Sequence, residues 1–352
     1  MHPETGMPSL IPIDGSRGEG GGQILRTALT LSAVTGQGFE IAKIRAGRLR
    51  PGLRPQHVAA VRAATLACGA KVGGAFEGSP DLRFEPGSVE AGDFRFEIAT
   101  AGAATLVVQA VLPALARAGR GSQVEVTGGT HVPTSPSFDF LARHWEPIVG
   151  RVGLGVRLQL TRAGFYPKGG GEVRSEVRPW VYPESALRLE ARGEFSGIRG
   201  ISGSGRLRGD VARRQRDAAQ AWFWERRRLE GVWDVVEVPA ASPGSFLLIE
   251  AVFQEGRLAV GVLGRRGLRA EVLGEQAART LLGWLDLEGA VDAHLADQLA
   301  VPLALSGRGG CVSTVRVTEH LRTVAWVLSA FGFPTRVWGR TGGPGGMEVQ
   351  GR

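Results

Sequence analysis

The chain has 352 residues, 43% of them hydrophobic and 22% charged, which is typical of soluble globular proteins and excludes a largely disordered chain. Its two cysteines, Cys68 and Cys311, exclude a disulfide-rich scaffold and a Cys-rich zinc site. The first ten residues lack the basic start and apolar core of a signal peptide, and the most apolar stretch, 103–116, is too short to span a membrane. We therefore expect a cytoplasmic protein of about two domains, without a membrane partner.

The basic residues are concentrated in one segment. The formal net charge is +8, and residues 41–76 contain seven basic side chains and no acidic one. Four of these, Arg45, Arg48, Arg50 and Arg54, lie within ten positions. Such a cluster suits a phosphate-rich partner, although a solvated basic loop explains it equally well.

Apolar periodicity predicts three copies of one unit, made of strand, helix, strand, helix and two strands. The first copy has strands at 10–13 and 39–45, helices at 22–35 and 56–68, and short strands after them. The second has helices at 103–118 and 138–149 and strands at 94–98, 123–127, 155–160 and 172–177. The third has helices at 294–305 and 319–330 and strands at 311–316, 335–338 and 347–350.

Residues 184–283 do not fit this unit. They begin with a strand at 187–191 and a Gly/Ser turn at 200–205, and then form a charged helix at 210–229. Strands at 232–238, 246–253 and 258–263 and a helix at 271–285 follow. We therefore predict an α+β protein in which three βαβαββ repeats form a large domain, 1–183 and 284–352. A smaller α+β domain, 184–283, is inserted before the last repeat.

Several common catalytic motifs are absent from the sequence. None of the three lysines follows a glycine, which excludes a P-loop. No Gly-x-Ser-x-Gly occurs, so a hydrolase nucleophile elbow has no support. No pair of histidines has the spacing of a metal site.

A glycine-rich run, 13–26, joins the first predicted strand to the first helix. Its glycines allow close backbone approach, and the helix start offers free N–H groups and a positive dipole. One carboxylate, Glu19, lies among the glycines. This arrangement suits a phosphate together with a hard metal ion. A Gly-rich turn with a solvated glutamate is an equally good reading.

Histidines at helix starts are further candidates. His57 follows the basic loop, whose arginines suit bidentate phosphate contacts. His294, Asp297 and Gln298 lie within two turns of one another on a later helix. His320 stands at the start of the helix 319–330, where the dipole favours the neutral imidazole that attacks phosphorus. A histidine at a helix start is more often structural, so these residues alone leave both interpretations open.

Five segments together resemble the RNA 3'-terminal phosphate cyclase family. They are 14–26, 45–57, Gly128-Gly-Thr-His-Val-Pro133, Phe165-Tyr-Pro-Lys-Gly-Gly-Gly171 and Leu295-Ala-Asp-Gln-Leu299. The resemblance covers most of the chain and implies three βαβαββ units with a small inserted domain. It also implies a three-step reaction. A histidine takes AMP from ATP, the AMP passes to an RNA 3'-phosphate to give RNA(3')pp(5')A, and the neighbouring 2'-OH displaces AMP to leave a 2',3'-cyclic phosphate.

The same resemblance implies roles for individual residues. His320 corresponds to the adenylated nucleophile and Glu19 to the ligand of Mg²⁺ or Mn²⁺. The phosphate and active-site cluster corresponds to Arg26, Arg45, Arg48, Gln56 and His57, and the adenylate pocket to Gln109, Pro136, His294, Asp297 and Gln298. His294 departs from the family pattern, because a tyrosine that stacks on adenine is common there; an imidazole also stacks, over a smaller area.

Two other classes of protein remain as alternatives. A ribosome-biogenesis factor of the same family keeps the fold but lacks the catalytic histidine, so it would bind RNA without becoming adenylated. Enolpyruvyl transferases share the fold of the large domain but have six repeats and no such histidine. We expect ATP and RNA with a 3'-phosphate end as partners, and we leave the oligomeric state open.

Overall fold

Three copies of the predicted unit build the larger part of the molecule. The computed structural model describes residues 10–207 and 209–351. The first copy contains β1 (Ile11–Asp14), α1 (Gly22–Thr35), β2 (Phe39–Ala42), α2 (Pro55–Cys68), β3 (Lys71–Gly73) and β4 (Leu82–Glu85). Its strands form a sheet of order β1-β2-β4-β3, in which β1 and β2 are parallel and the other pairs antiparallel. The predicted βαβαββ order is therefore confirmed for this copy.

The second copy differs from prediction in one helix. It contains β5 (Asp93–Glu97), α3 (Ala104–Leu115), β6 (Ser122–Gly128), β7 (Val156–Arg162) and β8 (Gly171–Val177), in the sheet order β5-β6-β8-β7. The single helix predicted at 138–149 is a π-helix, η1 (Phe140–Trp145), followed by α4 (Glu146–Arg151). Pro147 has no N–H to donate to the carbonyl of Arg143, which instead accepts a hydrogen bond from Arg257 Nη1 at 3.0 Å.

The third copy begins before the insert. It contains β9 (Leu187–Leu189), α7 (Ala293–Leu305), β14 (Gly309–Thr314), α8 (Glu319–Ala330), β15 (Thr335–Gly339) and β16 (Gly345–Gln350), in the sheet order β15-β16-β14-β9. The strand predicted at 187–191 was assigned to the insert, but β9 pairs in parallel with β14. The insert therefore follows the first strand of the last repeat, because a three-residue apolar alternation does not reveal which sheet a strand joins.

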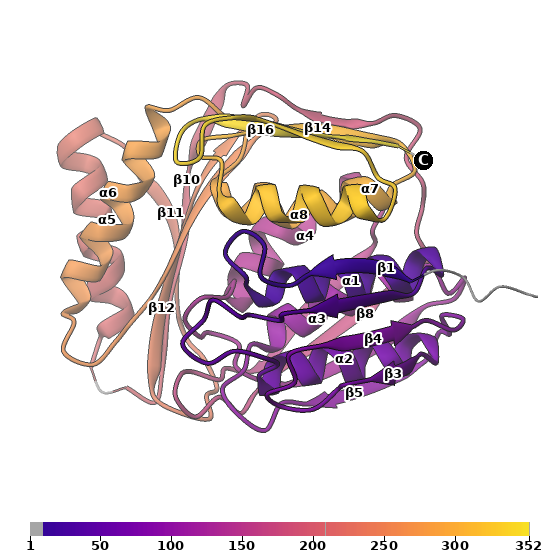
Figure 1. Ribbon diagram of the computed structural model, residues 1–352. Coiled ribbons are helices and arrows are strands. Elements are labelled where there is room, and N and C mark those ends of the chain that lie inside the picture. Colours follow the sequence, from indigo (N-terminus) through magenta and orange to yellow (C-terminus); the bar gives the residue numbers. More distant parts are fainter. Residues whose placement is uncertain (1–9, 208, 352) are drawn as a thin grey trace, which may run out of the picture.

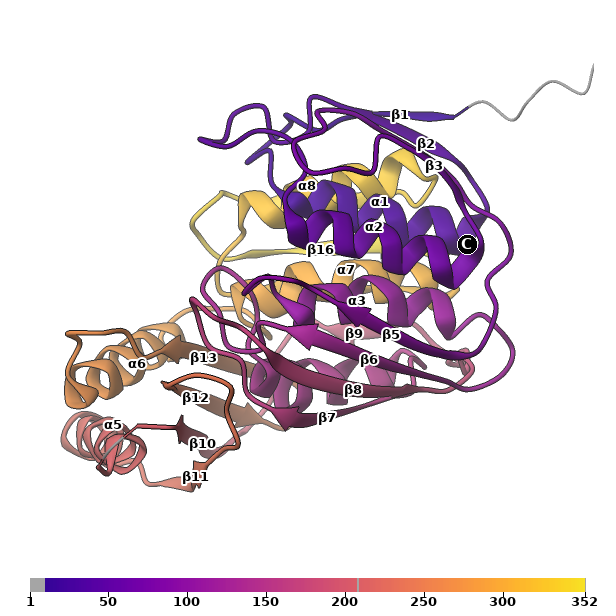
Figure 2. The same cartoon turned by 90° about the horizontal axis from the view of Figure 1, so that it is seen from below.

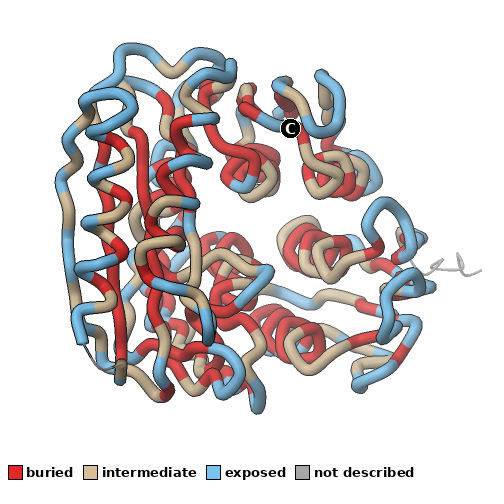
Figure 3. Tube along the Cα trace, turned by 90° about the vertical axis from the view of Figure 1, so that its left-hand side faces the viewer, coloured by how far each residue is buried: buried red, intermediate tan, exposed pale blue. Residues whose placement is uncertain are grey.

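The helices of the three copies meet in the centre of the large domain and the sheets lie outside them (Figures 1 and 2). Helix α1 packs against α2, α3 and α8, and α7 packs against α8 and η1. Buried segments, red in Figure 3, follow the inner faces of the helices, and many of the connecting loops are exposed. This packing brings the starts of α1, α7 and α8 from distant parts of the chain to one region.

The insert is a four-stranded sheet covered on its outer face by two helices (Figure 1). It contains β10 (Phe195–Gly205), α5 (Val211–Arg227), β11 (Gly231–Glu237), β12 (Gly244–Phe253), β13 (Arg257–Leu263) and α6 (Ala270–Leu285), in the sheet order β11-β10-β12-β13. Phe223 of α5 and Leu281 of α6 pack with Leu247 and Ile249 of β12 in a separate core. The opposite face of the sheet is joined to the main core through Phe246 and Leu248.

The Gly/Ser turn predicted at 200–205 is wrong, because these residues belong to the central strand β10. A Cβ on Gly200 would come closer than 3.0 Å to the ring of Trp233, and one on Gly203 would do the same with Phe246. The glycines therefore make room for aromatic rings of neighbouring strands. A local turn pattern cannot reveal a requirement that comes from another strand.

The described part of the chain contains no helix that is both long and apolar enough to cross a membrane. The expectation that no signal peptide is present concerns residues 1–9 and Leu10, and residues 1–9 lie outside the described residues.

Candidate active site

A cavity of about 500 Å³ opens between the central helices and the insert. Its wall is formed by α1, α3, α7 and α8, by η1 and the loop 134–137, and by Gly261 and Leu263 of β13. Seven of the predicted site residues line it: Arg26, Gln109, Pro136, His294, Asp297, Gln298 and His320. The packing of the three repeats thus collects residues that are up to 294 positions apart on one surface.

The glycine-rich loop brings Glu19 to the start of α8. Gly18 has a φ of 60°, and a Cβ there would come closer than 3.0 Å to the hydroxyl of Thr323 on α8. Only glycine therefore allows the loop to approach the helix this closely. The guanidinium of Arg17 lies 4.5 Å from the ring centroid of Trp326 and adds a second contact between the loop and α8.

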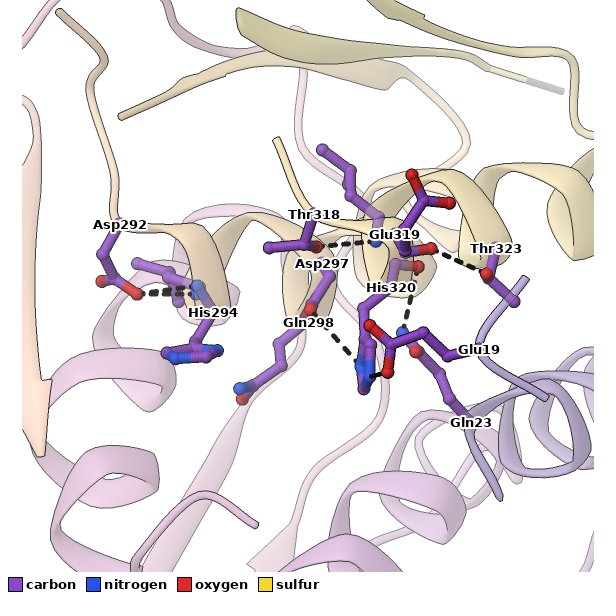
Figure 4. A network of polar contacts seen from close by, with 12 residues as sticks. Glu19, Gln23, Asp292, His294, Asp297, Gln298, Thr318, Glu319, His320 and Thr323 are labelled. Carbon is purple, nitrogen blue, oxygen red and sulfur yellow. Dashed lines mark hydrogen bonds and ion pairs between the residues drawn. The ribbon is translucent and has the colours of Figure 1, made fainter. Parts of the chain in front are cut away.

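His320 lies between two carboxylates (Figure 4). Its Nε2 is 2.9 Å from Glu19 Oε2, and its Nδ1 is 4.0 Å from Asp297 Oδ2. The carbonyl of His320 accepts a hydrogen bond from Gln23 Nε2 at 3.3 Å, which joins α8 to the first turn of α1. The side chains of Glu19 and His320 are each 44% exposed, so the imidazole is held in place and remains accessible from the cavity.

Arg26 and Asp297 lie in the cavity wall, and each affects the pKa of the other. Burial raises the pKa of Asp297 well above its usual value, and the carboxylates of Asp292 and Glu19 raise it further, whereas Arg26 opposes them. Loss of solvent lowers the pKa of Arg26 to about 10, and Asp297 counteracts this shift. Arg26 remains charged at neutral pH and is poorly hydrated, which favours binding of an anion.

His57 is buried beside this arginine as a neutral imidazole. Burial, followed by the charges of Arg26, Arg45 and Arg54, lowers the pKa of His57 to about 3. Its Nδ1 accepts a hydrogen bond from the backbone N–H of Arg54 at 3.0 Å, so the ring hydrogen is on Nε2. A Cβ on Gly22 would overlap this Nε2, which places the donor at the first turn of α1.

The basic loop, residues 45–54, is stabilised by hydrogen bonds within the loop, and Arg48 is the side chain that extends from it to Glu19. Arg48 Nη2 lies 3.4 Å from Glu19 Oε2. The Arg45 guanidinium donates to the carbonyls of Arg50 at 2.7 Å and Gly52 at 3.1 Å. Gln56 Oε1 accepts from the N–H of Ala103 at 3.4 Å, next to the start of α3. Arg45 and Gln56 thus contact the backbone around the site and do not line the cavity.

The other end of the cavity is formed mainly by α3 and α7. Gln109 Nε2 donates to Gln298 Oε1 at 2.7 Å, and the carbonyl of Gln298 accepts from Trp145 Nε1 at 3.4 Å. The carbonyl of Pro136 accepts from Thr105 Oγ1 at 2.9 Å, which fixes the loop 134–137 against α3. His294 lies on the first turn of α7 and is exposed. These groups offer a planar apolar wall and amide edges that suit a purine.

Comparisons with known proteins agree with this geometry. The sequence profile of the RNA 3'-terminal phosphate cyclase family matches residues 17–335. The protein named RNA 3'-terminal phosphate cyclase in Ralstonia nicotianae is 46% identical over 326 residues, which cover 91% of each chain. The protein of the same name in Pseudomonas fluorescens is 42% identical over 343 residues, which cover 97% of each chain. The chain belongs to the RNA 3'-terminal phosphate cyclase family. The predicted resemblance and this class of enzyme are confirmed.

Not all residues around this cyclase cavity were predicted. Gln23, Phe140, Trp145 and Leu263 also line it. Gln23 lies in the predicted glycine-rich run, to which the sequence assigned no role beyond Glu19 and the backbone. The two aromatic residues are on the π-helix, and Leu263 comes from the insert, so their approach depends on tertiary packing that has no local sequence signal.

The predicted Mg²⁺ or Mn²⁺ would have few protein ligands in this site. Among residues 10–207 and 209–351, no group of three or more His, Cys, Asp or Glu side chains is arranged to hold a metal ion. Glu19 alone presents an accessible carboxylate beside His320. Mg²⁺ in nucleotide sites often takes one or two carboxylates and completes its shell with phosphates and water. The site therefore fits a metal that arrives with a triphosphate, with Glu19 as its protein ligand.

Proposed function

We propose that the protein converts the 3'-terminal phosphate of an RNA into a 2',3'-cyclic phosphate at the expense of ATP. In the first step, a nitrogen of His320 attacks the α-phosphorus of ATP, a P–N bond forms, and pyrophosphate leaves. An oxygen of the RNA 3'-phosphate then attacks the same phosphorus, the P–N bond breaks, and RNA(3')pp(5')A forms. Finally the 2'-OH attacks the RNA phosphorus, loses its proton, and displaces AMP.

The position of His320 is the observation that carries this proposal. It is the histidine at the cavity wall that lies beside both Glu19 and Asp297. Its ring is held from two sides and half exposed, which suits a nucleophile that must meet a large substrate. A family relative without catalytic activity would not need this arrangement, so the geometry favours the enzyme over the RNA-binding factor.

The charges around His320 suit a triphosphate. Arg26 in the cavity wall and Arg48 beside Glu19 can neutralise phosphate oxygens that gain charge during transfer. His57 adds a neutral Nε2–H donor at the start of α1, where the helix dipole also favours an anion. Gln109, Pro136, His294, Asp297 and Gln298 would hold the adenosine at the other end of the cavity.

Glu19 has two proposed partners, His320 and a metal ion, and both are served by its carboxylate. A carboxylate only accepts hydrogen bonds, so in the free protein Nε2 of His320 carries the hydrogen that Glu19 accepts. When bound with ATP, Mg²⁺ or Mn²⁺ would be held by Glu19 and would withdraw charge from the phosphates. Glu19 cannot use the same oxygen for the metal and for His320. Once Glu19 binds the metal, the ring hydrogen would move through water from Nε2 to Nδ1, which faces Asp297 at 4.0 Å, and the lone pair freed on Nε2 would attack.

The first experiment tests the covalent step. The protein is incubated with α-labelled ATP and Mg²⁺ or Mn²⁺, and His320→Asn is compared with His294→Asn as a variant of the same cavity. We expect acid-labile, alkali-stable label in the wild type and in His294→Asn, and none in His320→Asn. Label that persists in His320→Asn would show that the nucleophile is wrong. No label in any protein would favour the RNA-binding factor.

The second experiment tests the acceptor. Short RNAs that end in a 3'-phosphate, a 3'-OH or a 5'-phosphate are compared, and the products are tested for a 2',3'-cyclic phosphate. Only the 3'-phosphate should yield it. Because an end must be recognised and not a base sequence, we expect little sequence preference and an affinity that falls as salt rises. Cytoplasmic location stays a prediction of the sequence.

A further inference from the structure

A buried ionic cluster lies beside the proposed adenosine site and has no part in the reaction described above. It consists of His144 on η1, Glu250 on β12 and Asp292 at the start of α7. His144 and Asp292 have no exposed surface, and Glu250 is 7% exposed. The three side chains come from the second repeat, the insert and the third repeat, so the cluster joins all three.

Both ring nitrogens of His144 face carboxylates. Nδ1 is 3.0 Å from Glu250 Oε1, and Nε2 is 2.6 Å from Asp292 Oδ2. An ionised carboxylate can only accept a hydrogen bond, whereas a neutral imidazole has one N–H and one bare nitrogen. Two ionised carboxylates are therefore satisfied together only by the doubly protonated ring, whereas a neutral ring would require one of the two carboxyl groups to carry the proton. Beside two ionised carboxylates, a neutral ring would leave one buried lone pair facing a carboxylate oxygen.

The local structure explains why the two carboxylates point at this ring. On β12, Leu247, Ile249 and Ala251 face the helices of the insert, so Glu250 points to the opposite side, toward the large domain. Asp292 is the N-cap of α7, and its Oδ1 accepts the N–H groups of His294 and Leu295 at 2.9 and 3.0 Å. Its other oxygen is left for His144 and for the N–H of Ala259 at 3.2 Å.

The cap connects this cluster to the cavity. Asp292 fixes the first turn of α7, and the same helix carries His294, Asp297 and Gln298 into the cavity wall (Figure 4). The π-helix that carries His144 also brings Phe140 and Trp145 to the cavity wall. The ring of Phe140 lies edge-on to the ring of His144, with 4.9 Å between the two ring centroids. Loss of the charge on His144 would therefore affect the cavity wall through two elements, α7 and η1.

We propose that His144 is a positioning residue that works as a buried imidazolium, tying the insert to the N-terminus of α7 and holding the nucleotide end of the cavity in its binding shape. The nucleotide part of this inference rests on the function proposed above; the protonated state of His144 does not. The proposal also assigns a role to the insert, because Glu250 lies on its strand β12.

The surrounding charges give the direction of the pH dependence. Burial alone would lower the pKa of His144, but Asp292 and Glu250 outweigh it and raise the pKa above its ordinary value. Arg257 Nη1 lies 4.0 Å from Glu250 Oε1, and His294 and Asp297 are the other titratable groups that act on Asp292 or respond to it. Because the folded pKa is raised, the link is complete below the ordinary pKa of a histidine, about 6.5, and is lost as pH rises through the folded pKa.

The protonation is measured directly on the protein without substrate. In protein with ¹⁵N-labelled histidine, NMR at pH 7.5 should show one buried ring with hydrogens on both nitrogens, and Asp292→Asn should remove this signal pattern. Asp292→Asn keeps the oxygen that caps α7, removes the charge, and replaces the oxygen that faces His144 and the N–H of Ala259 with an amide donor. A neutral His144 ring at pH 7.5 would overturn the proposal.

The connection to the cavity is measured by ATP binding as a function of pH. Glu250→Gln leaves the α7 cap intact and removes one of the two charges that keep His144 protonated. We expect wild-type affinity at low pH, and about fivefold weaker binding at a higher pH at which the wild type still binds fully, a factor in the range of one lost hydrogen bond. Gln215→Leu is the matched control, because Gln215 is buried in the insert between Ser202 and Ser245 and does not touch α7.

The two failures are distinguishable. An imidazolium without any shift of the ATP profile in Glu250→Gln would overturn the link to the cavity. The same shift in Gln215→Leu would also overturn it, because it would then reflect general loosening of the insert. If the wild type binds no ATP, the proposed function and the nucleotide part of the inference fail, and the NMR result still decides whether the protonated link exists.

Discussion

The close approach of Gly18 to Thr323 offers a test of whether the glycine-rich loop positions Glu19 for the proposed reaction. Gly18→Ala adds a Cβ that would come closer than 3.0 Å to Thr323 Oγ1, whereas ordinary contact begins at 3.4 Å. Thr323 is held in place by its hydrogen bond to the carbonyl of Glu319 at 2.7 Å. The loop must therefore move by on the order of 1 Å, and Glu19 moves with it away from His320.

Gly18→Ala should reduce the rate of adenylation by more than its effect on the free energy of unfolding would suggest. Alanine at a positive φ destabilises by about 1–2 kcal/mol. A misplacement of about 1 Å at a reacting group can cost about 100-fold in rate. We therefore expect Gly18→Ala to slow formation of the adenylated protein by about 100-fold, measured with α-labelled ATP in single turnover, at a free energy of unfolding only 1–2 kcal/mol lower, about the cost of the positive φ.

Two further substitutions separate the contact from the backbone strain. Gly36→Ala has the same type of strain, with a φ of 72°, but no atom within 4 Å of the added Cβ, so it should lose stability alone. Thr323→Ala removes the obstructing hydroxyl and should restore most of the rate to Gly18→Ala. Thr323→Val fills the same space and should not. Equal rates in the Gly18→Ala backgrounds with alanine and with valine at 323 would refute the reasoning.

Three other outcomes are expected. The pKa of His57 is lowered to about 3, so the wild type should lose up to about 1.4 kcal/mol of unfolding free energy per pH unit as pH falls from about 6.5 toward 3, and His57→Asn should lack this part of the slope in denaturant titrations. Gln298→Leu breaks the hydrogen bond with Gln109 and should raise the Kd for ATP about two- to tenfold in calorimetry, with no effect on the RNA acceptor preference. Arg48→Gln removes the cation beside Glu19 and should slow adenylation about tenfold, whereas Arg50→Gln should not; an unchanged rate would exclude Arg48 from this role.

Much of the fold follows from local pattern. The helices Gly22–Thr35 and Glu319–Ala330 are observed with the predicted bounds, because apolar spacing and a terminal glycine determine them locally. The predictions of local structure are wrong where a residue far away in the sequence determines the conformation or the sheet that a segment joins. Gly200 is a strand residue because Trp233 covers it, and Leu187–Leu189 joins the last repeat because β14 accepts it.

The site divides in the same way. Glu19 and His320 were predicted from motifs, and the structure brings them to 2.9 Å. His144 and Glu250 were not predicted, because a lone histidine on an apolar helix and a lone glutamate in an apolar strand look like ordinary sequence variation. Only the packing of η1 against β12 and α7 shows that they meet. Asp292 carried a signal, since an aspartate before an apolar helix is a typical N-cap.

The distribution of charge around His320 explains how one imidazole can serve as a nucleophile between two carboxylates. Two unpaired carboxylates would hold the ring as an imidazolium, which has no lone pair to attack phosphorus. In this site each carboxylate has its own arginine: Arg48 lies 3.4 Å from Glu19, and Arg26 acts on Asp297. At His144 both carboxylates lie within 3.0 Å of the ring, and among the ion pairs of the described residues Arg257 pairs with Glu250 at 4.0 Å and no arginine pairs with Asp292. The two sites therefore differ in exposure and in their arginines: His320 is half-exposed, with an arginine near each carboxylate, whereas His144 is buried beside Asp292, which has no arginine partner among these ion pairs. This difference suits the roles proposed here, an accessible nucleophile at His320 and a charged structural link at His144.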